Sequence, residues 1–96
     1  MLELRPNCEH CNKELPNNSI NAMICSFECT YCMTCALEVF ENVCPSCSGN
    51  FVRRPIRPES QLKKYPSSIN RIYQPKDLAL AKINSDKWKN VAPHKR

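Results

Sequence analysis

All eight cysteines of this chain lie between residues 8 and 47, in four close pairs. Three pairs have two intervening residues and one has three; the pairs are Cys8/Cys11, Cys25/Cys29, Cys32/Cys35 and Cys44/Cys47. A spacing of two lets a tight turn aim both sulfurs at one metal ion, and a tetrahedral ion takes two such pairs. A chain of 96 residues buries little apolar surface and usually needs crosslinks of this kind. The sequence therefore predicts two structural metal sites.

Zinc is the metal that this pattern favours. Thiolates are soft ligands that select zinc or an iron–sulfur cluster, and the clustered spacing of ferredoxins is absent here. Disulfides are the alternative, but they need an oxidising compartment. The first eight residues have no basic start followed by an apolar core, and no stretch approaches the roughly 20 apolar residues of a membrane helix. We therefore expect a cytoplasmic protein that binds two Zn²⁺ ions and no membrane.

The residues around the cysteines predict which pairs share an ion. Cys8 to Cys11 has the pattern of a knuckle turn, residues 22–31 alternate as in a short hairpin, and residues 36–42 favour a helix. Knuckle, hairpin and helix together make a treble clef, in which the knuckle and the helix start hold one metal. This assigns Cys8, Cys11, Cys32 and Cys35 to the first zinc, and Cys25, Cys29, Cys44 and Cys47 to the second.

This interleaved order resembles the cross-brace of RING fingers. The intervals between successive cysteines lie within that family's pattern, and Cys44-Pro45-Ser46-Cys47 is similar to its closing C-P-x-C motif. The fold class predicted is thus a small α+β domain stabilised by two zincs. Sequential pairing, in which the first two pairs share one ion and the last two share the other, is the alternative that spacing leaves open.

A second resemblance covers residues 1 to about 72. The start Met-Leu-Glu-Leu-Arg-Pro-Asn-Cys, the run from Ile24 to Thr30, and the run from Val52 to Pro58 are similar to the bacterial domain-of-unknown-function family 1272. Its members are short cysteine-rich proteins without an established activity. Residues 73–96 are expected to extend beyond the family core.

The sequence does not favour a ubiquitin ligase or another enzyme. RING ligases use an apolar residue between the first two cysteines and a basic residue after the last, where this chain has Glu9 and Ser48. A bacterial family also implies no ubiquitin system. Catalytic zinc keeps an open position, whereas eight cysteines fill two shells of four. His10 is expected to be an exposed residue of the knuckle turn. We therefore expect no enzymatic activity and no small-molecule substrate.

Charge divides the chain into two parts. Residues 1–50 carry two basic and six acidic side chains, and residues 51–96 carry twelve basic and three acidic ones. Eight thiolates binding two Zn²⁺ would take the first part from −4 to −8. We predict a zinc-binding domain over residues 1–58 and a basic extension, partly helical or disordered, over residues 59–96.

Several elements are predicted in the second half. The Arg-Pro segment from Val52 to Pro58 should be extended and lie near the second zinc, with Phe51 and Ile56 covering the core. Residues 59–65 favour a helical turn that stops at Pro66. A further helix is expected to open at Pro75 and run towards Trp88. Residues 90–96 are expected to be frayed.

Three functions follow from these patterns. The first is a protein-interaction or adaptor module, meeting an unknown protein partner through Met33, Leu37 and Phe40 or through the Arg-Pro segment. The second is binding of RNA or DNA by the basic extension. The contacts proposed for it are Arg53, Arg54, Arg57, Lys63 and Lys64. Redox or metal sensing by the cysteines is the third.

Overall fold

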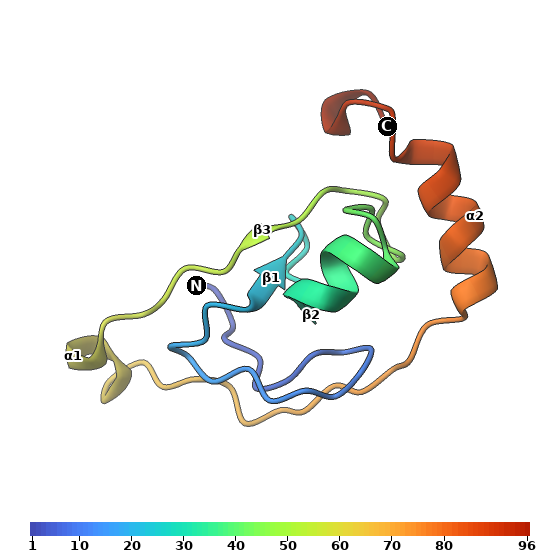
Figure 1. The fold of residues 1–96 in the computed structure, drawn as a ribbon. Coiled ribbons are helices and arrows are strands. Elements are labelled where there is room, and N and C mark those ends of the chain that lie inside the picture. The colour runs from blue at the N-terminus through green and yellow to red at the C-terminus, as the bar shows by residue number, and fades with distance from the viewer.

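The centre of the fold is a small antiparallel sheet with the strand order β2-β1-β3, seen in a computed structural model that describes residues 1–96 (Figure 1). Strands β1 (Ala22–Ile24) and β2 (Thr30–Cys32) form a hairpin, which confirms the hairpin predicted from the sequence. Strand β3 (Val52–Arg53) pairs with the other edge of β1. A sheet of such short strands is marginal in water without packing against other groups.

A short helix, η1 (Thr34–Val39), follows β2 directly. It is a six-residue π-helix, in which the Phe40 N–H donates to the Cys35 carbonyl at 2.9 Å. The helix was predicted over residues 36–42, so its existence is confirmed but its bounds were wrong. It ends early because Glu41 and Asn42 have φ values of 51° and 61°, in the left-handed region that terminates helices.

Aromatic rings and cysteines fill the core between the sheet and η1. The ring of Tyr31 meets those of Phe40 and Phe51 edge to face, with centroids 5.1 and 5.5 Å apart. Phe40 is fully buried, which corrects the prediction that it would face a partner. Of the other two residues named with it, Leu37 is exposed and Met33 is half-buried.

The Arg-Pro segment is extended, but a different residue from the one predicted faces inward. Phe51 is buried as expected, whereas Ile56 remains 49% exposed. Arg54 has only 4% of its surface exposed, and its side chain contacts the N-terminal segments. Its guanidinium donates to three carbonyl oxygens: Arg5 at 2.8 Å, Leu15 at 3.0 Å and Pro16 at 3.1 Å. Arg54 therefore joins three segments of the chain, because carbonyl oxygens satisfy its buried N–H groups.

Two helices follow in the second half. Helix α1 (Glu59–Leu62) confirms the helical turn predicted before Pro66. Helix α2 (Leu78–Trp88) begins three residues after the predicted start at Pro75. The cause is Asp77, whose carboxylate caps the helix by accepting from the Ala79 and Leu80 N–H groups at 2.9 and 3.2 Å.

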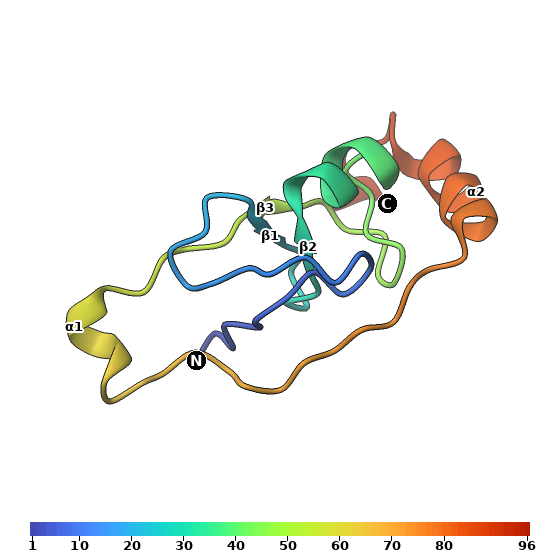
Figure 2. The same cartoon turned by 60° about the horizontal axis from the view of Figure 1, so that its bottom comes forward.

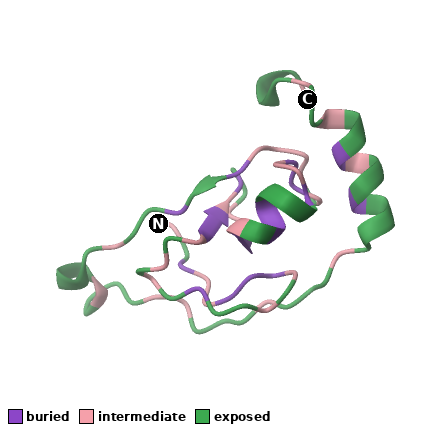
Figure 3. Cartoon of the chain, in the orientation of Figure 1, coloured by how far each residue is buried: buried purple, intermediate pink, exposed green.

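Two segments of the second half lie against the first half. Between α1 and α2 the chain runs beneath the N-terminal loop, and α2 stands beside the segment that follows η1 (Figures 1 and 2). The last turn, η2 (Pro93–Lys95), is followed by Arg96, whose guanidinium donates to the Asn42 and Ser48 carbonyls at 3.2 and 2.9 Å. The prediction of a frayed C-terminus was therefore wrong. Buried residues lie in β1 and β2, in the N-terminal loop and on the inner sides of η1 and α2, whereas β3 is exposed (Figure 3).

The buried arginine gives a first prediction. Arg54→Met should lower the free energy of unfolding by roughly 2–4 kcal/mol, because it leaves buried carbonyl oxygens without their donors. Arg53→Met, at the exposed neighbouring position, should change it by no more than about 0.5 kcal/mol. Denaturant unfolding of the metal-loaded protein measures both, and equal effects of the two substitutions would contradict the structural role of Arg54.

Candidate metal centres

The first and third cysteine pairs form one group. The sulfur atoms of Cys8, Cys11, Cys32 and Cys35 all lie within 4.8 Å of one another. Cys8 and Cys11 come from the N-terminal loop, Cys32 is the last residue of β2, and Cys35 lies in the first turn of η1. All except Cys11 are buried. The hairpin and η1 thus carry one pair of sulfurs to the N-terminal pair.

The turn that carries Cys8 and Cys11 is closed by its own backbone. The Asn12 N–H donates to the Cys8 carbonyl at 3.0 Å, and the Cys11 N–H points at the Cys8 sulfur at 3.5 Å. Asn12 has a φ of 68°, in the left-handed region that asparagine tolerates better than most residues. The turn therefore presents both sulfurs on one side.

The second and fourth pairs form the other group. The sulfurs of Cys25, Cys44 and Cys47 lie within 4.8 Å of one another. Cys29 is outside this close set, but its thiol interacts with those of Cys25 and Cys44. The structure thus has the interleaved grouping, in which the two N-terminal pairs do not lie in one group.

Backbone donors surround the second group as they do the first. The N–H groups of Phe27 and Gly49 point at the sulfurs of Cys25 and Cys47, each at 3.4 Å. The Ser48 N–H donates to the Cys44 carbonyl at 2.8 Å, and Ser48 has a φ of 66°. This repeats the Cys8–Asn12 turn. Hydrogen bonds to sulfur favour the thiolate, which is the form that binds metal.

The crowded thiols strongly perturb one another's proton affinities. Hydrogen bonds from Cys29 and Cys44 lower the pKa of Cys25 to about 2. Hydrogen bonds with Cys25 and Cys29 raise the pKa of Cys44, which therefore keeps its proton and acts as the donor. Burial raises the pKa of Cys35, and the hydrogen bond with Cys32 adds to it. Metal binding would release these protons, because cysteine binds metal as the thiolate.

The donor chemistry of both groups fits a metal ion. Each offers sulfur ligands only, and such soft donors in a set of four match a tetrahedral thiophilic metal. His10 does not join them, and it is not the exposed turn residue that was expected. It is half-buried, its ring meets that of Phe40 at 5.1 Å, and its Nδ1 accepts from the Lys76 N–H at 2.9 Å. Burial and the nearby Lys76 lower the pKa of His10.

The five residues predicted to contact nucleic acid differ in their exposure and in the contacts that they make. Arg53, Lys63 and Lys64 are exposed. Arg57 is half-buried and donates to the carbonyls of Leu2 and Tyr65. Arg54 is buried, as described above, so its prediction as a contact residue was wrong.

Glu9 is a residue of this region whose role the sequence did not reveal. Its carboxylate is buried and accepts from the Thr30 N–H at 2.6 Å and from the Arg5 guanidinium at 2.7 Å. It thereby ties the first cysteine turn to β2. A charged residue inside a Cys-x-x-Cys turn gives no local signal of such a long-range bond.

Fold and site together define a small cysteine-rich α+β protein with two cysteine groups that can hold metal ions. Residues 1–57 match the model of a family described as a protein of unknown function (DUF1272), and the chain belongs to that family. An uncharacterised protein of Rhizobium meliloti (strain 1021) is 54% identical over 79 residues, which cover 82% of this chain and 94% of the relative. No solved structure matches the chain. None of its helices has the length and apolar character needed to cross a membrane.

Metal removal provides the second prediction. A strong chelator should unfold residues 1–58, because the short sheet and η1 are held by the cysteine groups and metal binding is coupled to folding. Circular dichroism and NMR dispersion should both report the loss, and restored metal should reverse it. A chelated protein that keeps its native spectrum would contradict this expectation.

A single ligand substitution provides the third. Cys35→Ser should abolish one metal site and destabilise the protein by more than about 3 kcal/mol, since it breaks a buried ligand set. Ser46→Ala, at an exposed position beside the second group, is the matched control and should stay within about 0.5 kcal/mol of the parent. Metal stoichiometry and thermal unfolding measure the two effects.

Proposed function

We propose that this protein is a non-enzymatic zinc-binding module that presents a protein-interaction surface. The observation that carries the proposal is the pair of interleaved cysteine groups within a core of very short elements. Zinc is the ion that sulfur sets of this spacing favour, and it has no redox chemistry of its own. Two Zn²⁺ ions are thus assigned a structural role, and the surfaces that they hold in place carry the function.

The arrangement around the first group supports a treble clef. A closed cysteine turn, the β1–β2 hairpin and η1 follow one another, and β2 and η1 supply the second pair of ligands. The alternation of the two groups supports a cross-brace like that of RING fingers. Glu9, at the position where RING ligases carry an apolar contact, is buried in an ion pair with Arg5. The likeness therefore concerns architecture and not ligase activity.

Closed ligand sets support the absence of catalysis. A zinc ion bound by four cysteines has no position for a water molecule or substrate, whereas catalytic zinc keeps one. Cys29 belongs to the second set in this proposal, since its thiol already interacts with two members of that set. Both ions are then fully coordinated.

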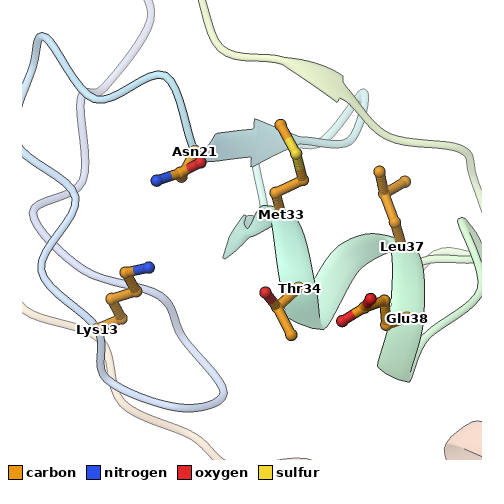
Figure 4. A pocket seen from close by; sticks show the side chains of 6 residues that line it. All are labelled: Lys13, Asn21, Met33, Thr34, Leu37 and Glu38. Atoms are coloured by element: carbon orange, nitrogen blue, oxygen red, sulfur yellow. The ribbon is translucent and has the colours of Figure 1, made fainter.

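A groove beside η1 is the proposed docking surface. It lies between the N-terminal loop, which contributes Lys13, and the outer side of η1 (Figure 4). Its volume is about 320 Å³. The lining residues are Lys13, Asn21, Met33, Thr34, Leu37 and Glu38. Met33 and Leu37 provide the apolar part, and the others surround it with polar groups.

The groove's charges indicate the kind of partner. Lys13 comes from the N-terminal loop and Glu38 from η1, so the groove has one cation and one anion on opposite walls, with Thr34 between them and the apolar Met33 and Leu37 alongside (Figure 4). We propose a protein segment that inserts an apolar side chain between an acidic residue facing Lys13 and a basic residue facing Glu38. Such a small contact corresponds to a transient interaction.

Nucleic-acid binding and redox sensing have less support as functions. Much of the positive charge of residues 59–96 already has partners within the chain. Arg71, Lys82 and Lys89 pair with Glu14 and Glu41, and Arg96 binds backbone carbonyls. An intramolecular partner at high effective concentration competes with phosphates. Closed four-sulfur zinc sites also disfavour redox sensing, since the metal occupies every thiolate and leaves no free thiol.

The fourth prediction tests the groove. A photo-crosslinking amino acid at position 37 should capture a protein partner, and the same residue at position 69, where Ile69 is 93% exposed, should not. With that partner purified, Leu37→Glu should weaken binding by about tenfold or more, because it places a charge on the apolar part of the groove. Ile69→Glu should leave the affinity unchanged. Equal affinities for both variants would contradict the proposed surface, as would a partner captured only at position 69.

A further inference from the structure

Residues 68–76, here called the strap, lie along the N-terminal loop that carries Cys8 and Cys11 (Figures 1 and 2). Three strap N–H groups donate to that loop: Ser68 to the Leu4 carbonyl at 3.0 Å, Gln74 to the Glu9 carbonyl at 2.8 Å, and Lys76 to His10 Nδ1 at 2.9 Å. Two of the acceptors, Glu9 and His10, lie inside the cysteine turn itself. The strap therefore contacts the turn between its two metal ligands.

Side chains reinforce this contact on both flanks of the turn. Arg71 donates to the side-chain and backbone oxygens of Asn12 at 3.0 and 3.1 Å, and it forms an ion pair with Glu14. On the other flank the buried Asn7 donates to the Ile72 carbonyl at 2.8 Å. Asn12 is the left-handed residue that closes the turn. Arg71 thus holds the residue on which the shape of the first cysteine turn depends.

A different part of the chain contacts the turn that carries Cys44 and Cys47. In α2, the Asn84 side chain accepts from the Ser48 hydroxyl at 3.2 Å and donates to the Cys44 carbonyl at 3.4 Å. Arg96 donates to the Ser48 carbonyl at 2.9 Å. Ser48 is the left-handed residue of this turn, equivalent to Asn12 in the first.

Helix α2 is anchored to the same region by a second contact. Glu41, which precedes the turn, accepts from the Ser85 hydroxyl at 3.1 Å and pairs with Lys82 and Lys89 at 3.3 and 3.4 Å. Ser85 is 1% exposed and Ala81 is 7% exposed, so this side of α2 is packed. These contacts are separate from those of the strap.

We propose that residues 68–96 form two independent braces, one for each metal centre, and that each brace sets how fast its own centre loses zinc. The strap with Arg71 braces the first centre, and α2 with Arg96 braces the second. Release of an ion requires the cysteine turn to open, and local opening becomes rarer when more contacts must break with it. Arg71 and Arg96 are positioning residues, since neither is a ligand. The inference rests on the proposed zinc centres.

The test uses full-length protein with Arg71→Ala or Arg96→Ala, and Lys64→Ala and Lys95→Ala as controls at exposed positions. Native mass spectrometry first counts the bound zinc. Excess chelator and a thiol-alkylating reagent are then added together, and peptide mapping follows the labelling of each cysteine with time. Arg71→Ala should speed labelling of Cys8 and Cys11 by about fivefold or more, with Cys44 and Cys47 unchanged. Arg96→Ala should do the reverse, and the controls should change neither.

Two results would overturn the braces: unchanged labelling in both arginine variants, or equal acceleration at all eight cysteines, which indicates a global loss of stability. Hydrogen exchange of residues 8–14 and 41–48 in the same samples reports opening of each turn whatever metal is bound. A protein without two zincs would therefore contradict the proposed function, while exchange would still decide whether each arginine protects its own turn.

Discussion

The gathering of the cysteine sulfurs into two groups, each proposed to bind one metal ion, is the constraint on which this fold depends. The strands are two or three residues long and η1 has six residues, so backbone pairing alone cannot hold them. Five of the thirteen residues in the buried core cluster are cysteines, and these come from segments spread between residues 8 and 44. The first group joins the N-terminal loop to β2 and η1, and the second joins the hairpin to the 44–47 turn. Each group therefore fixes segments that the other does not reach.

Opposite charges on the two halves of the chain hold the second half against the cysteine-rich part. The cysteine-rich part is acidic, and metal binding by thiolates would make it more so, whereas the second half is basic. The two halves meet through specific pairs, such as Arg71 with Glu14 and Lys89 with Glu41, and through arginines that bind carbonyls. Exposed pairs of this kind contribute little stability individually. Their effect is to fix the position of the second half relative to the cysteine turns.

The sequence predicted the features that depend on local pattern. Cysteine spacing, the alternation of residues 22–31 and the helical run after Cys35 were enough to give the interleaved groups, the hairpin and a helix in the right order. The turn at Glu59 and its end before Pro66 were also predictable from proline chemistry. The start of α2 was missed because Asp77 acts as its cap, outcompeting the preference of Pro75 for the first helical position.

Features that depend on contacts distant in the sequence could not be predicted. The strap binds largely through backbone N–H groups, which every non-proline residue has, so its sequence carries little signal. Arg54 is buried and Ile56 is exposed, the opposite of what was expected. The reason is that three carbonyl oxygens in the protein interior accept hydrogen bonds from the Arg54 guanidinium. Phe40 turned inward because η1 is a π-helical turn and the ring meets both His10 and Tyr31.

The proposed two-metal architecture itself can be tested by replacing zinc with the NMR-active isotope of cadmium and correlating each metal signal with cysteine protons. The account predicts two signals, one coupled to Cys8, Cys11, Cys32 and Cys35 and the other to the remaining four cysteines. A single signal, or one that couples Cys8 and Cys11 with Cys25 and Cys29, would contradict it.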